Sequence, residues 1–169
     1  GMQRSDHGYI PVSGHLQRQL ALMPASVAIL APGVNAFRRL RKNLTEPVFN
    51  SWGYNTRSAA LRIPCSDDRN RRIEYRLAGA DANPYLVAAT ILTGMLYGLE
   101  KTDDEDLPEP QHDRPELPLF QQEAIETFAR CQYLTDSLGD AFSEQWVACK
   151  LSELDWFERI VTREESLLA

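Results

Sequence analysis

Cysteine and histidine are scarce in this sequence. Its 169 residues include three histidines and three widely separated cysteines, Cys65, Cys131 and Cys149, with no CxxC pair. Dispersed cysteines in odd number are typical of reduced thiols, so the sequence predicts neither a disulfide framework nor a zinc site and favours a cytoplasmic location. The N-terminus lacks a positive segment followed by an apolar run, so no signal peptide is expected.

Long hydrophobic runs are missing as well. The most apolar segment follows Asn83-Pro84 and ends near Leu99, which is short for a membrane span. Asparagine followed by proline is a strong helix start, because asparagine caps the helix and proline suits its first turn. The segment therefore predicts a buried central helix and no membrane partner.

Basic residues are the minority, since the formal net charge is −6, but they are concentrated in one segment. Between Asn35 and Arg76, nine arginines and Lys42 stand against four acidic residues, so this segment carries +6 and the remainder −12. Aromatic residues suited to base stacking are not interleaved with the arginines, and the acidic remainder would repel a long phosphate backbone. The pattern favours a small phosphorylated ligand over nucleic acid.

The length is that of one domain with a real core. We predict an α+β fold in which antiparallel strands, with a hairpin at about 57–77, pack against helices, and the C-terminal half is largely helical. Residues 1–11 form a lead-in, where Gly1 is interpreted as a tag remnant, and residues 12–169 form the domain. The expected elements are two helices (14–23 and 24–30), a turn capped by Asn35, strands (48–53, 59–63 and 71–77), the helix after Asn83, an acidic proline-rich loop (101–118) and a helical tail (119–169), in which 138–140 mark a break.

The predicted strand at 71–77 carries the chemistry. Arg72, Glu74 and Arg76 alternate with Ile73, Tyr75 and Leu77, which places three charged side chains on one face of the strand and three apolar ones on the other. A carboxylate between two guanidiniums, with Arg57 and Arg62 on the preceding segment, suits a polyanion and its metal. The alternative from spacing alone is a charge-paired, solvated strand face. Because Arg57 and Arg62 are five residues apart, both can face one pocket only if Arg57 lies before the strand or at a bend.

Five motifs in a fixed order suggest a family. They are Asn35-Ala36-Phe37-Arg38-Arg39-Leu40, Trp52-Gly53, Arg57 through Arg62-Ile63-Pro64, Arg72-Ile73-Glu74-Tyr75-Arg76 and Ala82-Asn83-Pro84-Tyr85-Leu86. This series resembles the C-terminal part of the glutamine synthetase catalytic domain, from about Tyr9 to the C-terminus. Residues 78–86 resemble most the γ-glutamylputrescine synthetase branch of that family.

The resemblance implies an ATP-dependent ligase that activates the γ-carboxylate of glutamate as an acyl phosphate, which an amine then displaces. By motif position, Glu74 is implied as a ligand of Mg²⁺ or Mn²⁺, and Arg39 as the group that binds the α-carboxylate of glutamate. Arg57 and Arg62 are implied as catalytic arginines on the nucleotide phosphates and the transferred phosphoryl group. Arg72 is implied at the nucleotide, and Arg76 at the γ-phosphoryl or glutamate side.

The sequence also departs from the family pattern. The other metal-binding glutamates, a metal-binding histidine and a glutamate-binding segment of the family cannot be found in residues 1–34, and Thr45 stands where true glutamine synthetases carry a glutamate that takes a proton from ammonium. Two hypotheses follow. One is a glutamate–amine ligase, present as a truncated C-terminal part that is inactive alone. The other is a non-catalytic remnant that binds itself, a full-length homologue or a missing complementary domain. A phosphotransferase of the guanidino-kinase kind is a third, weaker alternative.

Overall fold

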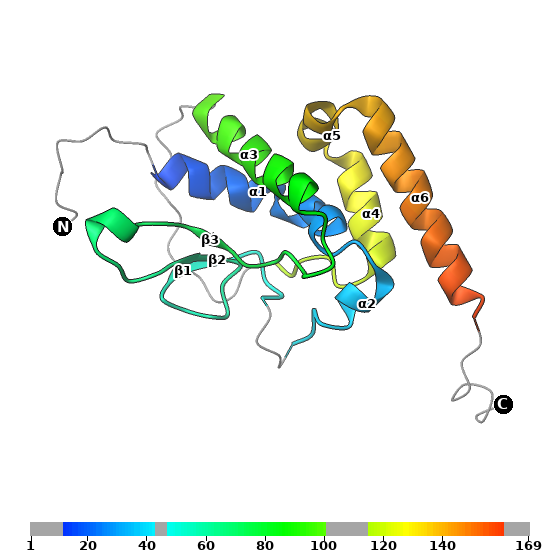
Figure 1. The fold of residues 1–169 in the computed structure, drawn as a ribbon, viewed down its shortest axis with the longest axis horizontal. Helices are drawn as coiled ribbons and strands as arrows, with labels where there is room; N and C mark the ends of the chain where they lie inside the picture. The colour runs from blue at the N-terminus through cyan, green and yellow to red at the C-terminus, as the bar shows by residue number, and fades with distance from the viewer. Residues whose placement is uncertain (1–11, 43–46, 101–114, 161–169) are drawn as a thin grey trace.

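The computed structural model describes residues 12–42, 47–100 and 115–160, and these form a mixed α and β fold (Figure 1). The elements in chain order are α1 (Val12–Leu30), α2 (Val34–Phe37), β1 (Trp52–Tyr54), β2 (Leu61–Ile63), the 3₁₀ turn η1 (Asp68–Asn70), β3 (Glu74–Tyr75), α3 (Pro84–Glu100), α4 (Gln121–Arg130), α5 (Gln132–Leu138) and α6 (Asp140–Glu158). The helices lie to one side of a small sheet, and α1 runs between the sheet and α3.

The central helix is α1, and it is one helix where the sequence predicted two. Pro24 lies inside it and has no backbone N–H, which leaves the carbonyl of Leu20 without its helical donor. Asn50 supplies that donor from a neighbouring segment, because its Nδ2 lies 2.9 Å from the Leu20 oxygen. Leu16 and Leu30, one on each side of the proline, are fully buried. Their burial, at about 1.5–3 kcal/mol each, offsets the cost of roughly 3 kcal/mol for an internal proline.

Helix α3 starts where the sequence predicted, because the Asn83 side chain accepts a hydrogen bond from the backbone N–H of Tyr85 at 2.9 Å. The prediction of a buried central helix is wrong. The buried residues of α3, which packs on α1, are the small Thr90, Thr93, Gly94 and Gly98. Leu86 and Val87 are partly buried against the core, whereas Leu92, Leu96 and Leu99 point outward and are each 56% exposed. Small side chains let two helix backbones approach closely, so α3 packs on α1 mainly through these small residues.

The sheet has the order β1-β2-β3. Strands β2 and β3 are antiparallel, with Arg62 opposite Glu74, and this confirms the predicted hairpin. Strands β1 and β2 are parallel, which the prediction of antiparallel strands missed. Parallel neighbours usually need a long crossover, whereas here residues 55–60 make the return. That short return begins with Asn55 in the left-handed region, at φ 52°.

The described part of the predicted helical tail, up to residue 160, is helical from α4 to α6, and Gly139 separates α5 from α6 with a φ of 91°; residues 161–169 lie outside the described part. Two smaller predictions need correction. Asn35 lies inside α2 and does not cap it, since Gly33 occupies the N-cap position. The last part of the predicted acidic loop is paired, because Glu116 bridges Phe49; residues 101–114 lie outside the described part, as does Thr45. Among the described helices, none is long and apolar enough to cross a membrane.

An aromatic cluster joins the ends of α1, α3 and α5. The rings of Tyr97 and Tyr133 lie 4.1 Å apart between centroids, and the Arg18 guanidinium lies 5.3 Å from the Tyr97 ring centre. The Tyr133 hydroxyl donates to Glu100 Oε2 at 2.8 Å. Partial burial and the neighbouring Glu100 carboxylate raise the pKa of Tyr133 to about 12. The hydrogen bond therefore forms only with the neutral phenol.

This cluster gives a pH-dependent prediction. A tyrosine whose pKa is raised on folding stabilises the fold fully below its unfolded pKa of 10.0, and this stability is lost as the pH rises towards the folded value of about 12. At pH 8, Tyr133→Phe is expected to lower the free energy of unfolding by about 1 kcal/mol. The difference from the wild type should shrink as urea unfolding is repeated between pH 9 and pH 11.5. A difference that stays constant with pH would show that the hydrogen bond is not responsible.

Candidate functional site

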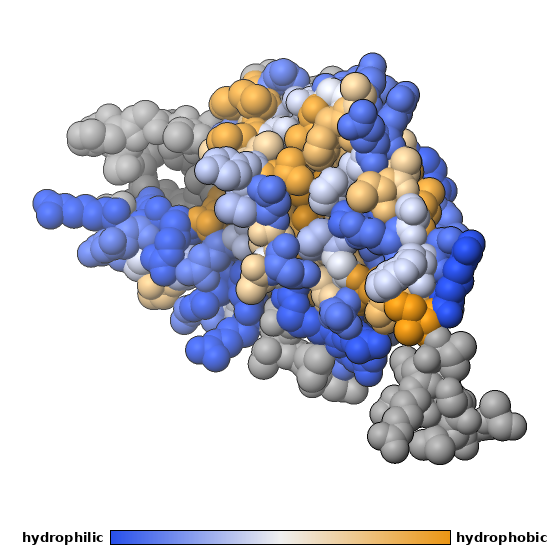
Figure 2. Space-filling view, turned by 45° about the vertical axis from the view of Figure 1, so that its right-hand side comes forward, coloured by the Kyte–Doolittle hydropathy of each residue, from blue (hydrophilic) through white to orange (hydrophobic). Residues whose placement is uncertain are grey.

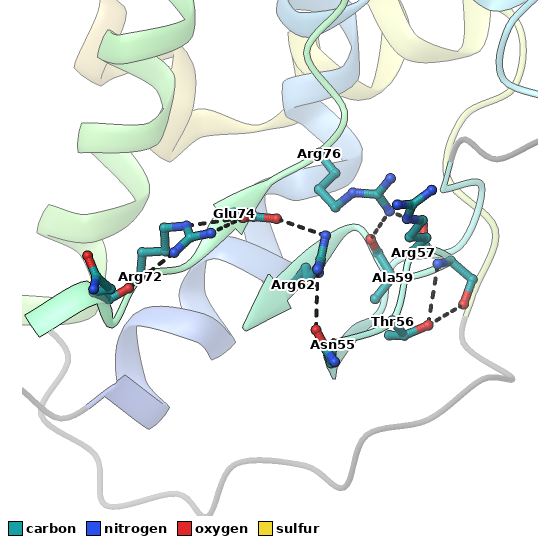
Figure 3. A network of polar contacts seen from close by, with 10 residues as sticks. Asn55, Thr56, Arg57, Ala59, Arg62, Arg72, Glu74 and Arg76 are labelled. Atoms are coloured by element: carbon teal, nitrogen blue, oxygen red, sulfur yellow. Dashed lines mark hydrogen bonds and ion pairs between the residues drawn. The ribbon is translucent and has the colours of Figure 1, made fainter. Parts of the chain in front are cut away.

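Three charged side chains meet across β2 and β3. Directly opposed residues of an antiparallel pair project to the same face, so Arg62 and Glu74 lie next to each other, with Nη1 3.4 Å from Oε2. Arg72 approaches the other carboxylate oxygen, with Nη2 at 3.0 Å and Nε at 3.1 Å from Oε1. Figure 3 shows the carboxylate between the two guanidiniums. One carboxylate thus holds two arginines on an accessible sheet face.

Arg76 is not part of this group, although the alternation predicted it there. Its Nη1 donates to the backbone oxygens of Arg57 and of Ala59, the latter at 3.3 Å. Strand β3 ends at Tyr75, so the regular alternation does not extend to Arg76. The second guanidinium at Glu74 comes from the neighbouring strand, as Arg62. Arg57 lies in the bend between β1 and β2 and not on a strand. The five-residue spacing requires such a position if Arg57 and Arg62 are to face one pocket.

The apolar side of the same strand is only partly as predicted. Leu77 is buried, and Tyr75 packs against the core with a pKa raised well above its usual value by burial. Ile73, in contrast, is 38% exposed, because it precedes the paired part of the strand. The predicted alternation therefore holds only for the two residues of β3. Glu74 points to the charged outer face, and Tyr75 packs against the core.

Asn55 is a site residue that the sequence analysis did not find. Its side-chain oxygen accepts a hydrogen bond from Arg62 Nη2 at 3.3 Å, and its backbone N–H donates to Ile63 at 3.0 Å. Arg62 is thus held by Glu74 on one terminal nitrogen and by Asn55 on the other. The sequence could have indicated this residue, because an asparagine at the start of the short connection between β1 and β2 tolerates the left-handed region.

We expect Asn55→Ala to cost about 1–2 kcal/mol of folding free energy, because alanine is strained at positive φ. Asn55→Gly should recover most of this loss, since glycine has no Cβ. Urea unfolding of both variants measures the difference. If the two variants lose equal stability, the hydrogen bond to Arg62, and not the backbone conformation, is what Asn55 contributes.

Arg39 lies in a second group, near two glycines. A Cβ placed on Gly79 would lie 2.7 Å from Arg39 Nη2 and 2.3 Å from an oxygen of Asp81, so both side chains lie directly against Gly79. The other Asp81 oxygen faces Gly33. Gly79 is anchored to the end of α1 by a hydrogen bond from its N–H to the Leu30 oxygen at 2.9 Å. Glycine is therefore needed at 79 for Arg39 to occupy this position.

The possible metal-binding side chains of the described residues do not form a complete metal site. Within residues 12–42, 47–100 and 115–160, no group of three or more histidine, cysteine, aspartate or glutamate side chains could hold a metal ion. Mg²⁺ requires near-octahedral oxygen coordination, and Glu74 offers one carboxylate that two arginines already contact. Glu74 can supply one ligand to a cation but cannot bind one alone.

A groove of about 760 Å³ lies on another part of the molecule. Its lining is mainly apolar and also includes Arg38, Arg41 and Lys42. Lys42 is paired with Glu116, and Phe120 at the groove is 74% exposed. None of the predicted site residues lines this groove.

Comparisons with known proteins agree with the order of the motifs. The family model "Glutamine synthetase, catalytic domain" matches residues 12–168. Gamma-glutamylputrescine synthetase PuuA of Escherichia coli (strain K12) is 43% identical over 162 residues, which cover 89% of this chain and 33% of PuuA. Mouse Lengsin is 34% identical over 153 residues, covering 85% of this chain and 26% of Lengsin. A solved structure described as apo GmaS without ligand has a TM-score of 0.79 at 25% identity, covering 96% of this chain and 39% of that one.

The described fold therefore matches part of a solved relative, and the family model covers nearly the whole chain. The chain belongs to the family of the glutamine synthetase catalytic domain. It spans about a quarter to a third of the length of the curated relatives described here.

Proposed function

We propose that this chain is the C-terminal part of the catalytic domain of an ATP-dependent glutamate–amine ligase, of the γ-glutamylputrescine synthetase kind. The observation that carries the proposal is the Arg62–Glu74–Arg72 group on the sheet face, combined with the 43% identity to PuuA. In such a ligase, the γ-carboxylate of glutamate attacks the γ-phosphorus of ATP and releases ADP. An amine then attacks the γ-glutamyl phosphate, and inorganic phosphate leaves.

The arginines are the groups that would contribute most to this reaction. Phosphoryl transfer depends on positioning and on stabilising spread negative charge, and one well-placed arginine can contribute ~10³–10⁵ in rate. This corresponds to roughly 4–7 kcal/mol of barrier. In this proposal Arg57 and Arg62 bind the phosphates and the transferred phosphoryl group, and Arg72 binds the nucleotide. Arg76 positions the bend that carries Arg57.

Glutamate would bind at the second group. Arg39 is the residue proposed for its α-carboxylate, because a guanidinium fork matches a carboxylate in two parallel hydrogen bonds. The place of Arg39 against Gly79 and Asp81 supports this role, since a half-buried arginine with a fixed position loses less entropy on binding. Glu74 would supply one ligand of Mg²⁺ or Mn²⁺, and other oxygen ligands would come from ATP or from outside the described residues.

Calorimetric titration with ATP tests the proposal, with and without Mg²⁺ and glutamate. Saturable binding that glutamate strengthens about tenfold supports a ligase site in which both substrates are neighbours. A screen of ammonia, putrescine and other amines for phosphate release then identifies the acceptor. No binding at millimolar ATP would overturn the proposal for this chain.

A second candidate is a nucleotide-binding module without turnover. The specific observation in its favour is that Glu74 is shared by two arginines and belongs to no group of three or more possible metal-binding side chains in the described residues. Such a module would bind ATP through its arginines and release no phosphate with any amine. The same titration and phosphate assay separate the two candidates.

A further inference from the structure

Helix α3 presents an apolar outer face that no other element of the described chain covers. The exposed apolar residues on this helix are Tyr85 (84%), Leu92 (56%), Met95 (43%), Leu96 (56%) and Leu99 (56%), together with the exposed Ala88. Figure 2 shows apolar surface at the top of the molecule, on the side where α3 lies in Figure 1. Exposed apolar patches of this size on a globular protein mark interaction sites.

The spacing of these residues is that of a helix-pairing seam. Positions 85, 88, 92, 95 and 99 follow one another at intervals of three and four residues. This interval keeps an apolar stripe on one side of a helix over four turns, as in the seams of paired helices. From Pro84 to Leu99 the helix carries no charged residue. When another helix covers the seam, no charged side chain is therefore removed from water without a partner.

We propose that α3 pairs with α3 of a second copy of this chain, antiparallel and about a two-fold axis at Leu92. Under that symmetry Leu92 meets Leu92 of the second copy, and Tyr85 meets Leu99. Ala88 lies opposite Leu96, which borders the seam, and next to the seam residue Met95. The small Ala88 leaves room for Leu96 on either side of the central Leu92 pair, which allows close packing there. The antiparallel arrangement also places each helix end beside the opposite end of its partner, which is the favourable orientation of two helix dipoles.

The size of the face favours a second copy over an incidental contact. The exposed parts of Tyr85, Leu92, Met95, Leu96 and Leu99 amount to roughly 600 Å² per copy. A contact that covers all of this surface on both copies reaches the lower end of the ~1,200–2,000 Å² that specific interfaces bury in total. An isologous contact uses this area on both copies at once, because the same patch meets itself. Unrelated partner helices are usually selected by charges beside the seam, and α3 offers none before Glu100.

Sedimentation velocity of the whole chain tests the pairing. The wild type should be a dimer with a dissociation constant in the range of about 1–100 μM. Leu96→Glu should raise that constant at least 100-fold, because it places a charge in the dry seam. Phe120→Glu is the control and should leave the dimer unchanged, since Phe120 is an exposed apolar residue (74%) away from α3, at the N-cap of α4. Circular dichroism checks that both variants keep their helices.

Cysteine cross-linking tests the register. In a chain with Cys65→Ser and Cys149→Ser, Leu92→Cys should form a disulfide-linked dimer under mild oxidation, because its Cα atoms meet at the axis within the ~7 Å that a disulfide permits. Leu99→Cys should not link to itself, but should link to Tyr85→Cys when the two proteins are mixed.

Three outcomes would overturn the pairing. The wild type could remain a monomer at about 500 μM, as expected if another protein covers α3. The dimer could survive Leu96→Glu or be lost with Phe120→Glu, which would place the interface elsewhere. Leu99→Cys could link to itself as readily as Leu92→Cys, which would exclude the antiparallel register.

Discussion

Glu74→Gln is expected to remove the strengthening of ATP binding by Mg²⁺ while leaving metal-free binding intact or up to about tenfold tighter. The carboxylate contacts Arg62 and Arg72 in the present structure, so it neutralises part of the charge that would meet phosphate. Glutamine keeps the shape and an acceptor for Arg72 but loses the charge that a hard cation needs. Calorimetric titration of both proteins with ATP, with Mg²⁺ and with chelator, measures the two effects separately.

The control for this variant is Glu153→Gln. Glu153 is an exposed carboxylate in an ion pair with Lys150 on α6, and its loss should change neither titration. A structural role for Glu74 predicts another pattern. The melting temperature of Glu74→Gln would fall while the Mg²⁺ response remained, and this result would remove Glu74 from the proposed cation site.

Gly94→Ala is expected to destabilise the fold by about 2 kcal/mol, or roughly 4–8 °C in Tm. A Cβ at this position would lie 2.5–2.9 Å from the side-chain amide of Gln19. Gln19 is buried and donates to the Ile91 oxygen at 2.7 Å, so it cannot move aside without losing that hydrogen bond in the interior. The gain of about 1 kcal/mol that alanine brings to a helix is too small to compensate. Thermal unfolding followed by circular dichroism gives the Tm.

A double-mutant cycle identifies the cause. In a Gln19→Ala background the obstructing amide is gone, so Gly94→Ala should be neutral or stabilising by up to ~1 kcal/mol. An equal loss of stability in both backgrounds would show that Gly94 is required for some reason other than its contact with Gln19.

The elements that were predicted correctly depend on local chemistry. Asn83-Pro84 starts α3 because an asparagine oxygen accepts from the first N–H groups of a helix wherever that helix lies. Gly139 separates α5 from α6 because a left-handed residue ends a helix without help from distant groups. The turn residues at 64–70 place β2 and β3 next to each other, and the two strands then pair antiparallel.

The errors concern groups that are distant in sequence. A proline inside a helical pattern predicts a break, unless another segment supplies the missing donor, and Asn50 is 30 residues away from Leu20. The apolar composition of α3 predicted burial, but composition does not say which face of a helix meets a neighbour. The pairing of Glu74 with Arg62 depended on register across two strands, whereas alternation along one strand suggested Arg76.

The sequence by itself determined the family, the helical and hairpin segments and the set of arginines, because motif order and local capping do not depend on the fold around them. The tertiary structure decided which arginines share a carboxylate, that α1 is continuous through Pro24, and that one apolar side of α3 faces outward. These features depend on contacts between residues far apart in the chain. Their energies are set by register, burial and the availability of a distant donor, which no local pattern encodes.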